Sequence, residues 1–259
     1  MEITLYQIDA FTNNVFGGNP AAVCPLEEWL DDNMMQKIAE ENNLSETAFF
    51  VKRETGYDLR WFTPTIEIEL AGHPTLAAAY VIFNYCNHGS SKISFSSKSG
   101  ELTVIKDGDL LKMNFPSMKP ANTGENELLN RALGNKPVEL YRTRDYLAIY
   151  SNQREILSID PDFGLLKRLD CLGIIVSAPG DEADFVSRCF APAAGINEDP
   201  VTGSAHSTLI PYWSKRLNKR DLYAYQLSKR GGELFCRYLG DRVEIAGRAV
   251  YYLKGTITI

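Results

Sequence analysis

One five-residue pattern occurs twice in this chain of 259 residues and limits the folds open to it. The pattern R-x-F-x-P is present at Arg60–Pro64 and again at Arg188–Pro192. Each copy ends an expected strand, and a glycine that opens an expected helix follows within a dozen residues, at Gly72 and at Gly203. We therefore expect two similar halves related by a pseudo-twofold axis, with both helix starts facing a shared cleft.

The hydrophobic pattern predicts more strands than helices. The expected strands cover residues 3–11, 47–52, 57–62, 101–106, 110–115, 138–141, 146–150, 171–177, 185–190, 222–227, 233–239 and 243–246. The expected helices cover 74–85, 125–133 and 204–217, and another begins at residue 31 or 32. Because these helices do not alternate with the strands one by one, the pattern disfavours a doubly wound or barrel α/β fold.

A segment rich in proline and glycine, residues 116–124, breaks the pattern in the middle of the chain. We place the domain boundary there. The expected halves are residues 1–117 and residues 118–259, with the option that a terminal strand crosses back to the first half.

Composition excludes several classes of partner. The formal net charge is 27 − 33 = −6, and the chain has no long basic run, which argues against nucleic-acid binding. No window of about 18 apolar residues is present, so we expect no membrane span. The N-terminus lacks the basic and apolar regions of a secretion signal. The five cysteines are scattered and odd in number, which favours reduced thiols and, by elimination, a cytoplasmic location.

The two expected helix starts are candidate binding sites for an anion. The first turn of a helix exposes unpaired N–H groups and carries about half a positive charge. Pro74 suits the first helical position, and Gly72 and Gly203 let a ligand approach the backbone closely. Two such starts at one cleft would hold a small carboxylate-bearing molecule. The alternative is that both are ordinary helix caps.

Three ionisable residues lie next to these segments. His73 precedes the first helix, Asp199 lies four residues before Gly203, and Glu46 precedes an apolar strand. A carboxylate against an apolar wall has a raised pKa and can exchange protons near neutral pH, so Glu46 is the candidate acid/base. Each residue also has an alternative interpretation without a catalytic role. Glu46 could be a surface glutamate, His73 could cap the helix, and Asp199 could be a turn residue before Pro200.

Other chemistry has weaker support. The sequence contains none of the motifs that cradle nucleotides or dinucleotides, hold catalytic zinc or present a hydrolase nucleophile. Nucleotides and dinucleotide cofactors therefore have no visible binding motif, and bound zinc is not expected. Two alternatives stay open: a serine hydrolase that uses Ser204 with His73 and Asp199, and a protein that binds a small acid without catalysis.

Several blocks of the sequence resemble one known family. The blocks are DAFT at 9–12, FGGNPAAV at 16–23, LSETAF at 44–49, RWFTP at 60–64, GHPT at 72–75 and EDPVTGSA at 198–205. In this order they resemble the phenazine-biosynthesis isomerase-like (PhzF-like) family, with weaker traces at Gln226 and Gly231–Gly232.

The resemblance implies a diaminopimelate-epimerase-like α/β (α+β) fold, in which each half is a curved, mostly antiparallel sheet around a central helix. It also implies a cofactor-independent isomerase, commonly a homodimer. The family's characterised member moves a proton within a dihydro-hydroxyanthranilate ring. The implied acid/base is Glu46, with His73 and Asp199 as further catalytic residues. The implied substrate contacts come from Ser45, Gly72, Gly203 and Ser204.

Overall fold

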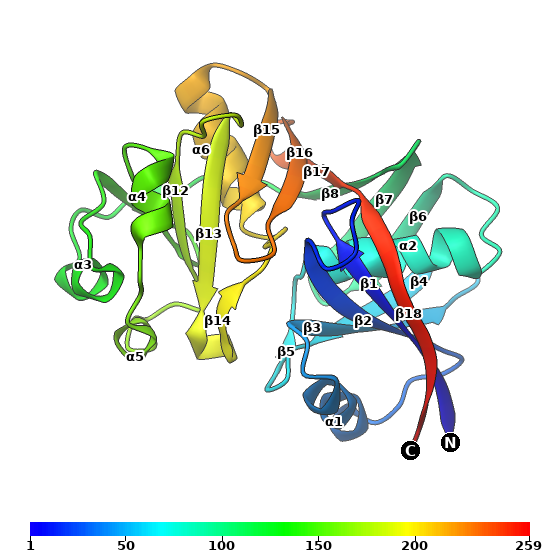
Figure 1. The fold of residues 1–259 in the computed structure, drawn as a ribbon. Helices are drawn as coiled ribbons and strands as arrows, with labels where there is room; N and C mark the ends of the chain where they lie inside the picture. The colour runs from blue at the N-terminus through cyan, green and yellow to red at the C-terminus, as the bar shows by residue number, and fades with distance from the viewer. The chain divides into compact units, whose positions relative to one another are not determined.

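The computed structural model describes residues 1–259, and the chain folds as two units (Figure 1). The first unit comprises Met1–Phe115 and Glu244–Ile259, and the second comprises Pro116–Val243. Strand β17 (Arg242–Gly247) spans the return of the chain from the second unit to the first. None of the helices combines the length and the apolar composition that a membrane-spanning helix needs.

The first unit is built on a mixed sheet in which antiparallel pairs predominate. The paired strands run in the order β18-β1-β2-β3-β4-β6-β7-β8, and β5 shares one edge of β4 with β6. The bounds are β1 (Glu2–Ala10), β2 (Asn19–Leu26), β3 (Glu46–Lys52), β4 (Tyr57–Phe62), β5 (Glu67–Ile68), β6 (Lys92–Ser97), β7 (Gly100–Asp107), β8 (Leu110–Pro116) and β18 (Ala249–Thr258).

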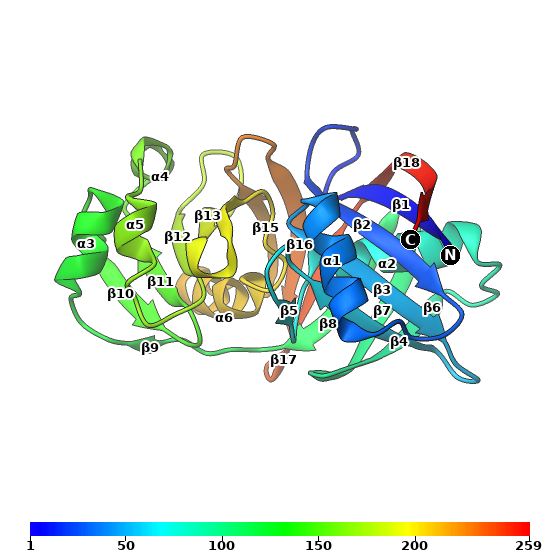
Figure 2. The ribbon, with the colours of Figure 1, turned by 90° about the horizontal axis from the view of Figure 1, so that it is seen from below.

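Two helices cover opposite faces of this sheet (Figure 2). Helix α1 (Asp32–Asn42) begins where the Asp31 carboxylate accepts a hydrogen bond from the Met34 backbone N–H. It packs its buried side chains on one face of β1 to β4. Helix α2 (His73–Tyr85) is apolar on nearly all sides and packs against β1, β2 and β3. A helix that is apolar all round must be buried, which makes α2 the central helix of the unit.

The second unit repeats this arrangement with its own strands. The paired order is β9-β10-β11-β12-β13-β15-β16, and β14 shares an edge of β13 with β15. The bounds are β9 (Ala121–Asn122), β10 (Glu139–Arg142), β11 (Tyr146–Ile149), β12 (Ile174–Ala178), β13 (Phe185–Ala191), β14 (Ile196–Asp199), β15 (Asp221–Gln226) and β16 (Gly232–Tyr238). The helices are α3 (Glu127–Leu133), α4 (Gln153–Ser158), α5 (Phe163–Leu166) and α6 (His206–Leu217), with a 3₁₀ turn at Pro192–Ala194.

Strand pairing confirms that the two units are copies of one plan. In the first unit β1 to β4 pair as antiparallel, parallel and antiparallel, and β10 to β13 do the same in the second. Strands β4 and β6 pair in parallel across the helix connection, as β13 and β15 do. The expected fold class, mixed α/β with similar halves and mostly antiparallel sheets, is therefore correct.

The repeated R-x-F-x-P pattern makes the same contacts in each unit. Arg60 lies over the Phe62 ring, 5.2 Å from its centroid, and donates two hydrogen bonds of 2.8 Å to Glu67. Arg188 lies 5.0 Å from the centroid of Phe190 and donates bonds of 2.7 and 3.0 Å to Glu198. Both guanidinium groups thus clamp the strand that follows their own.

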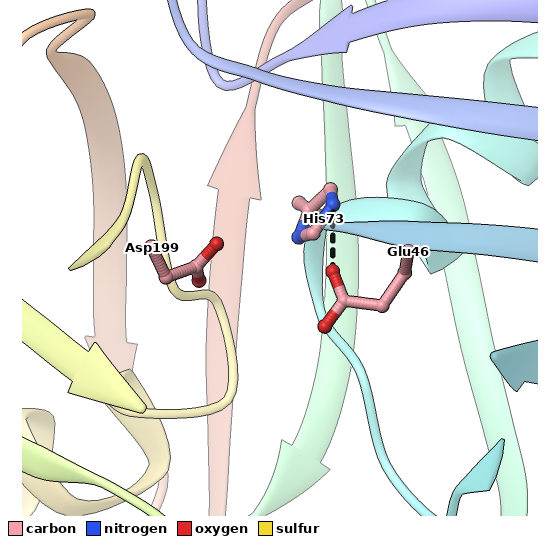
Figure 3. A group of neighbouring side chains, drawn as sticks. All are labelled: Glu46, His73 and Asp199. Atoms are coloured by element: carbon pink, nitrogen blue, oxygen red, sulfur yellow. Dashed lines mark ion pairs between the residues drawn. The ribbon is translucent and has the colours of Figure 1, made fainter. Parts of the chain in front are cut away.

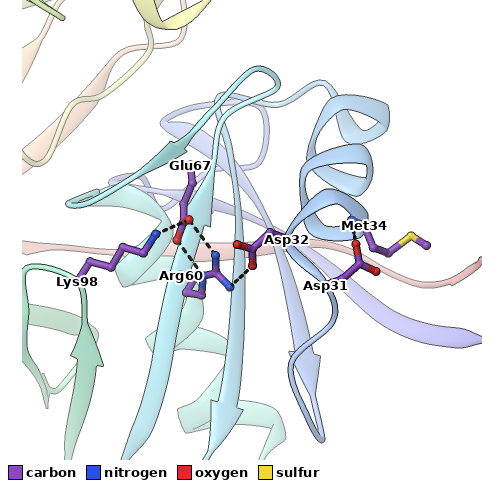
Figure 4. A network of polar contacts seen from close by, with 6 residues as sticks. All are labelled: Asp31, Asp32, Met34, Arg60, Glu67 and Lys98. Atoms are coloured by element: carbon purple, nitrogen blue, oxygen red, sulfur yellow. Dashed lines mark hydrogen bonds and ion pairs between the residues drawn. The ribbon is translucent and has the colours of Figure 1, made fainter.

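The first of these clamps also ties α1 to the sheet (Figure 4). Besides Glu67, Arg60 bonds the Asp32 carboxylate at 2.8 Å, and Lys98 reaches the same Glu67 at 2.5 Å. The Arg60 hydrogen bond is the largest cause that lowers the pKa of Glu67. The carboxylate therefore stays charged, and the clamp persists, well below neutral pH.

Some element boundaries differ from those expected. Helix α6 begins at His206 rather than at residue 204, because Gly203–Ala205 form a tight turn whose i+3 hydrogen bonds lead into the helix. Helix α3 begins at Glu127 rather than at 125, because the Asn126 side chain caps it. The sequence patterns missed several strands and helices: β2, β5, β6, β9, β14, β18, α4 and α5.

Candidate active site

Three polar side chains gather where elements of the first unit begin. Asn19 is the first residue of β2, Glu46 the first of β3 and His73 the first of α2. Because β2 and β3 are parallel, their first residues lie at the same end of the two strands, and α2 packs on both strands. All three side chains are buried, with exposed fractions of 0%, 7% and 2%.

Glu46 and His73 are in direct contact (Figure 3). Their Oε2 and Nε2 atoms lie 3.0 Å apart, the distance of an ion pair, although the alignment falls short of a hydrogen bond. Burial lowers the pKa of His73 to about 3, so the imidazole is neutral at physiological pH. The contact therefore joins a carboxyl group to a neutral ring. The raised pKa expected for Glu46 stays a prediction.

The backbone around His73 has the expected form of a helix start. Gly72 is the N-cap of α2, and its carbonyl accepts a hydrogen bond from the Leu76 N–H. Pro74 occupies the first turn, where its missing N–H costs nothing. No side chain caps this end of α2. Ser45, half-buried, directly precedes β3. The first unit thus holds four of the expected site residues within two short segments.

The remaining expected residues belong to the second unit. Asp199 is the last residue of β14 and is 5% exposed. Its Oδ2 accepts a hydrogen bond of 2.6 Å from the Thr202 hydroxyl. Gly203 and Ser204 lie in the turn that leads into α6. The equivalent segment of the first unit, between β5 and α2, ends at Gly72 and leads into His73, the first residue of α2.

A buried glutamine holds the Asp199 turn in place. Gln226, the last residue of β15, is fully buried. Its Oε1 accepts from the Thr202 N–H at 2.8 Å, and its Nε2 donates to the Asp199 carbonyl at 2.8 Å and to the Thr202 hydroxyl at 3.2 Å. In the sequence, Gln226 stands out only weakly, as a trace of the family resemblance near the C-terminus.

We predict that Gln226→Leu destabilises the protein. The change leaves the Thr202 N–H and the Asp199 carbonyl without their partner, and each buried unpaired group costs about 1–3 kcal/mol. Urea unfolding followed by circular dichroism measures the loss. Gln153→Leu is the control, because Gln153 accepts a single hydrogen bond at an exposed site and its loss should cost about 0.5 kcal/mol or less. Equal stability of the two variants would contradict this role of Gln226.

His206 forms a hydrogen bond within the same turn. Its Nδ1 lies 2.9 Å from the Thr202 carbonyl, to which the protonated nitrogen donates. Its Nε2 has no hydrogen-bond partner, so it does not activate the Ser204 hydroxyl. Ser204 and His206 therefore do not form a nucleophile–base pair.

Comparison with solved structures defines the class of protein. The crystal structure of a hydroxyproline epimerase from Agrobacterium vitis has a TM-score of 0.67 at 10% identity, covering 99% of this chain and 92% of that one, which concerns the fold alone. A PhzF-family crystal structure from Enterococcus faecalis has a TM-score of 0.95 at 49% identity, and the match covers 100% of both chains. The fold is thus that of the epimerase-like isomerases.

Sequence comparison identifies the family. The model described as phenazine biosynthesis-like protein matches residues 8–255. An uncharacterized isomerase of Pseudomonas aeruginosa is 49% identical over 257 residues, 99% of each chain. The human phenazine biosynthesis-like domain-containing protein is 38% identical over 297 residues, 100% of each chain. This chain belongs to the phenazine biosynthesis-like (PhzF-like) family and is an isomerase.

Proposed function

We propose that this isomerase shifts a proton within a small carboxylate-bearing metabolite, without a cofactor, and that Glu46 is its acid/base. Glu46 takes a proton from a carbon next to an electron-withdrawing group. The electron pair of the broken C–H bond delocalises into that group. The same carboxyl group then returns the proton to a different carbon, so the product is an isomer of the substrate and Glu46 is regenerated.

The contact between Glu46 and His73 is the observation that supports this proposal most. A buried carboxylate is stripped of the water that would weaken it as a base. A neutral imidazole beside it can donate a hydrogen bond without adding a charge that would hold the carboxylate ionised. A surface glutamate, the alternative considered from sequence, would be solvated and would not contact a buried ring.

The other groups in the proposal bind and orient the substrate. We assign the carboxylate of the substrate to the N–H groups at Gly72–His73 and Gly203–Ser204, with Ser45 as a further contact. His73 and Asp199 then stabilise developing charge through hydrogen bonds. The proposal also includes a homodimer and a cytoplasmic location, both of which rest on the family resemblance and on composition.

Deuterium incorporation tests the proposed function. The wild-type protein is incubated in D₂O with dihydro-hydroxyanthranilate and with a panel of small amino, hydroxy and aromatic acids, and each acid is examined by proton NMR. We expect at least one acid to exchange a carbon-bound proton for deuterium in the presence of the protein. An acid that binds in a thermal-shift assay while no acid exchanges would instead support the non-catalytic alternative and overturn the proposal.

A further inference from the structure

Asn19 contacts the ring nitrogen of His73 that faces away from Glu46. The Asn19 side chain is fully buried, and its Nδ2 lies 3.0 Å from His73 Nδ1. The opposite ring nitrogen, Nε2, lies 3.0 Å from the Glu46 carboxylate. The imidazole is therefore held between an amide on one side and a carboxyl group on the other, all within the first unit.

The hydrogen-bonding capacity of these groups selects one form of the ring. A neutral imidazole carries its proton on one nitrogen and accepts at the other. The Asn19 amide N–H faces Nδ1, so Nδ1 must be the accepting nitrogen. The proton then sits on Nε2, the ring nitrogen that lies 3.0 Å from the Glu46 carboxylate. In the opposite tautomer, an N–H would face another N–H at Asn19, and two lone pairs would face each other at Glu46.

We propose that Asn19 is a positioning residue that fixes His73 in the Nε2–H tautomer. This inference rests on the proposed function for its meaning in catalysis, because a ring held this way is a hydrogen-bond donor toward the base and the substrate. Asn19 acts in this role through its contact with the His73 ring. Its effect passes through the position of one proton on His73.

The position of the Asn19 amide explains how β2 contributes to the site. Asn19 opens β2 opposite Ala10 of β1, and Ala21 of the same strand lies opposite Glu46 in β3. The amide is therefore anchored by the sheet that also carries Glu46. A rigid anchor of this kind keeps the ring orientation constant while substrates enter and leave.

Nitrogen NMR on the whole protein tests the tautomer directly. The protein is labelled with ¹⁵N-histidine, and long-range proton–nitrogen spectra are recorded at pH 7. The His73→Gln variant identifies the signals of His73 among the three histidines. We expect the shift of a protonated nitrogen at Nε2 and of an unprotonated nitrogen at Nδ1. A protonated Nδ1 with an unprotonated Nε2 in the wild-type protein would overturn the inference, whatever the activity.

Two variants separate positioning from simple packing. Asn19→Asp replaces the donor by an acceptor, so the proton should move to Nδ1 and deuterium exchange should fall in kcat rather than in KM. Asn19→Leu fills the same space with a side chain that neither donates a hydrogen bond to Nδ1 nor accepts one from it, so this variant should give a mixture of the two tautomers. If Asn19→Asp leaves the wild-type tautomer in place, Asn19 does not fix it. A failure of the proposed function would look different. The wild-type protein would then exchange no proton of any acid, although its His73 would still show the expected tautomer.

Discussion

Replacing Glu46 by glutamine is expected to lower deuterium exchange on an accepted acid by about 10²–10⁴-fold. Glutamine has nearly the shape of glutamate, and its side-chain oxygen is still an acceptor beside the His73 ring. An amide, however, does not take a proton from carbon. The variant therefore removes the base while leaving the surroundings of the site in place. The rate is measured by NMR in D₂O at saturating substrate.

Glu40→Gln is the matched control for this prediction. Glu40 lies on the exposed side of α1, so the same chemical change there should leave the exchange rate within about twofold of wild type. Urea unfolding of Glu46→Gln should give a stability equal to or above that of wild type, because the change removes a charge from a buried position. A folded Glu46→Gln protein with an undiminished exchange rate would exclude Glu46 as the base.

Lowering the pH from 7 to 5 is expected to destabilise the protein by about 4 kcal/mol, of which each of two buried histidines contributes roughly half. Burial lowers the pKa of His73 to about 3 and that of His206 to about 4. Both values lie below the ordinary value of 6.5, so the unfolded chain binds these protons first. Stability is complete above pH 6.5 and declines as the pH falls toward the folded-state values.

Histidine variants check the source of this acid sensitivity. His206→Asn keeps a donor for the Thr202 carbonyl but does not titrate, so it should remove about half of the stability difference between pH 7 and pH 5. His73→Asn should remove the other half. Denaturant unfolding of the wild type and the two variants at both pH values measures the three differences. If both single variants retain the full wild-type difference, these two imidazoles are not its cause.

The fold was predictable where the local signal in the sequence is strong, such as a continuous apolar run or a turn sequence. Helix α2 and the hairpin at Gly108 are examples, since Gly108 adopts the positive φ of 61° that its turn requires. Strand β2 was missed because Pro20 and Pro25 interrupt it, and proline normally argues against an inner strand. Strand β18 was missed because it is exposed along most of its length and shows no alternation of buried and exposed residues.

Sequence patterns indicated the candidate site through its ionisable residues and glycines, but not through its amide side chains. Glu46 and His73 carry chemistry that a reader of the sequence can recognise, but their contact depends on packing between β3 and α2. Asn19 and Gln226 were not selected as site residues because an amide has no charge and many structural roles. Their importance lies in which groups they face, and only the folded chain defines that.

A crystal structure with an acid that exchanges deuterium bound to the wild-type protein tests the central claim most directly. The account predicts that the exchanging carbon lies about 3–3.5 Å from a carboxylate oxygen of Glu46, with His73 still between Glu46 and Asn19. An acid that is bound with its exchanging carbon out of reach of Glu46, and closer to another proton acceptor, would contradict the account.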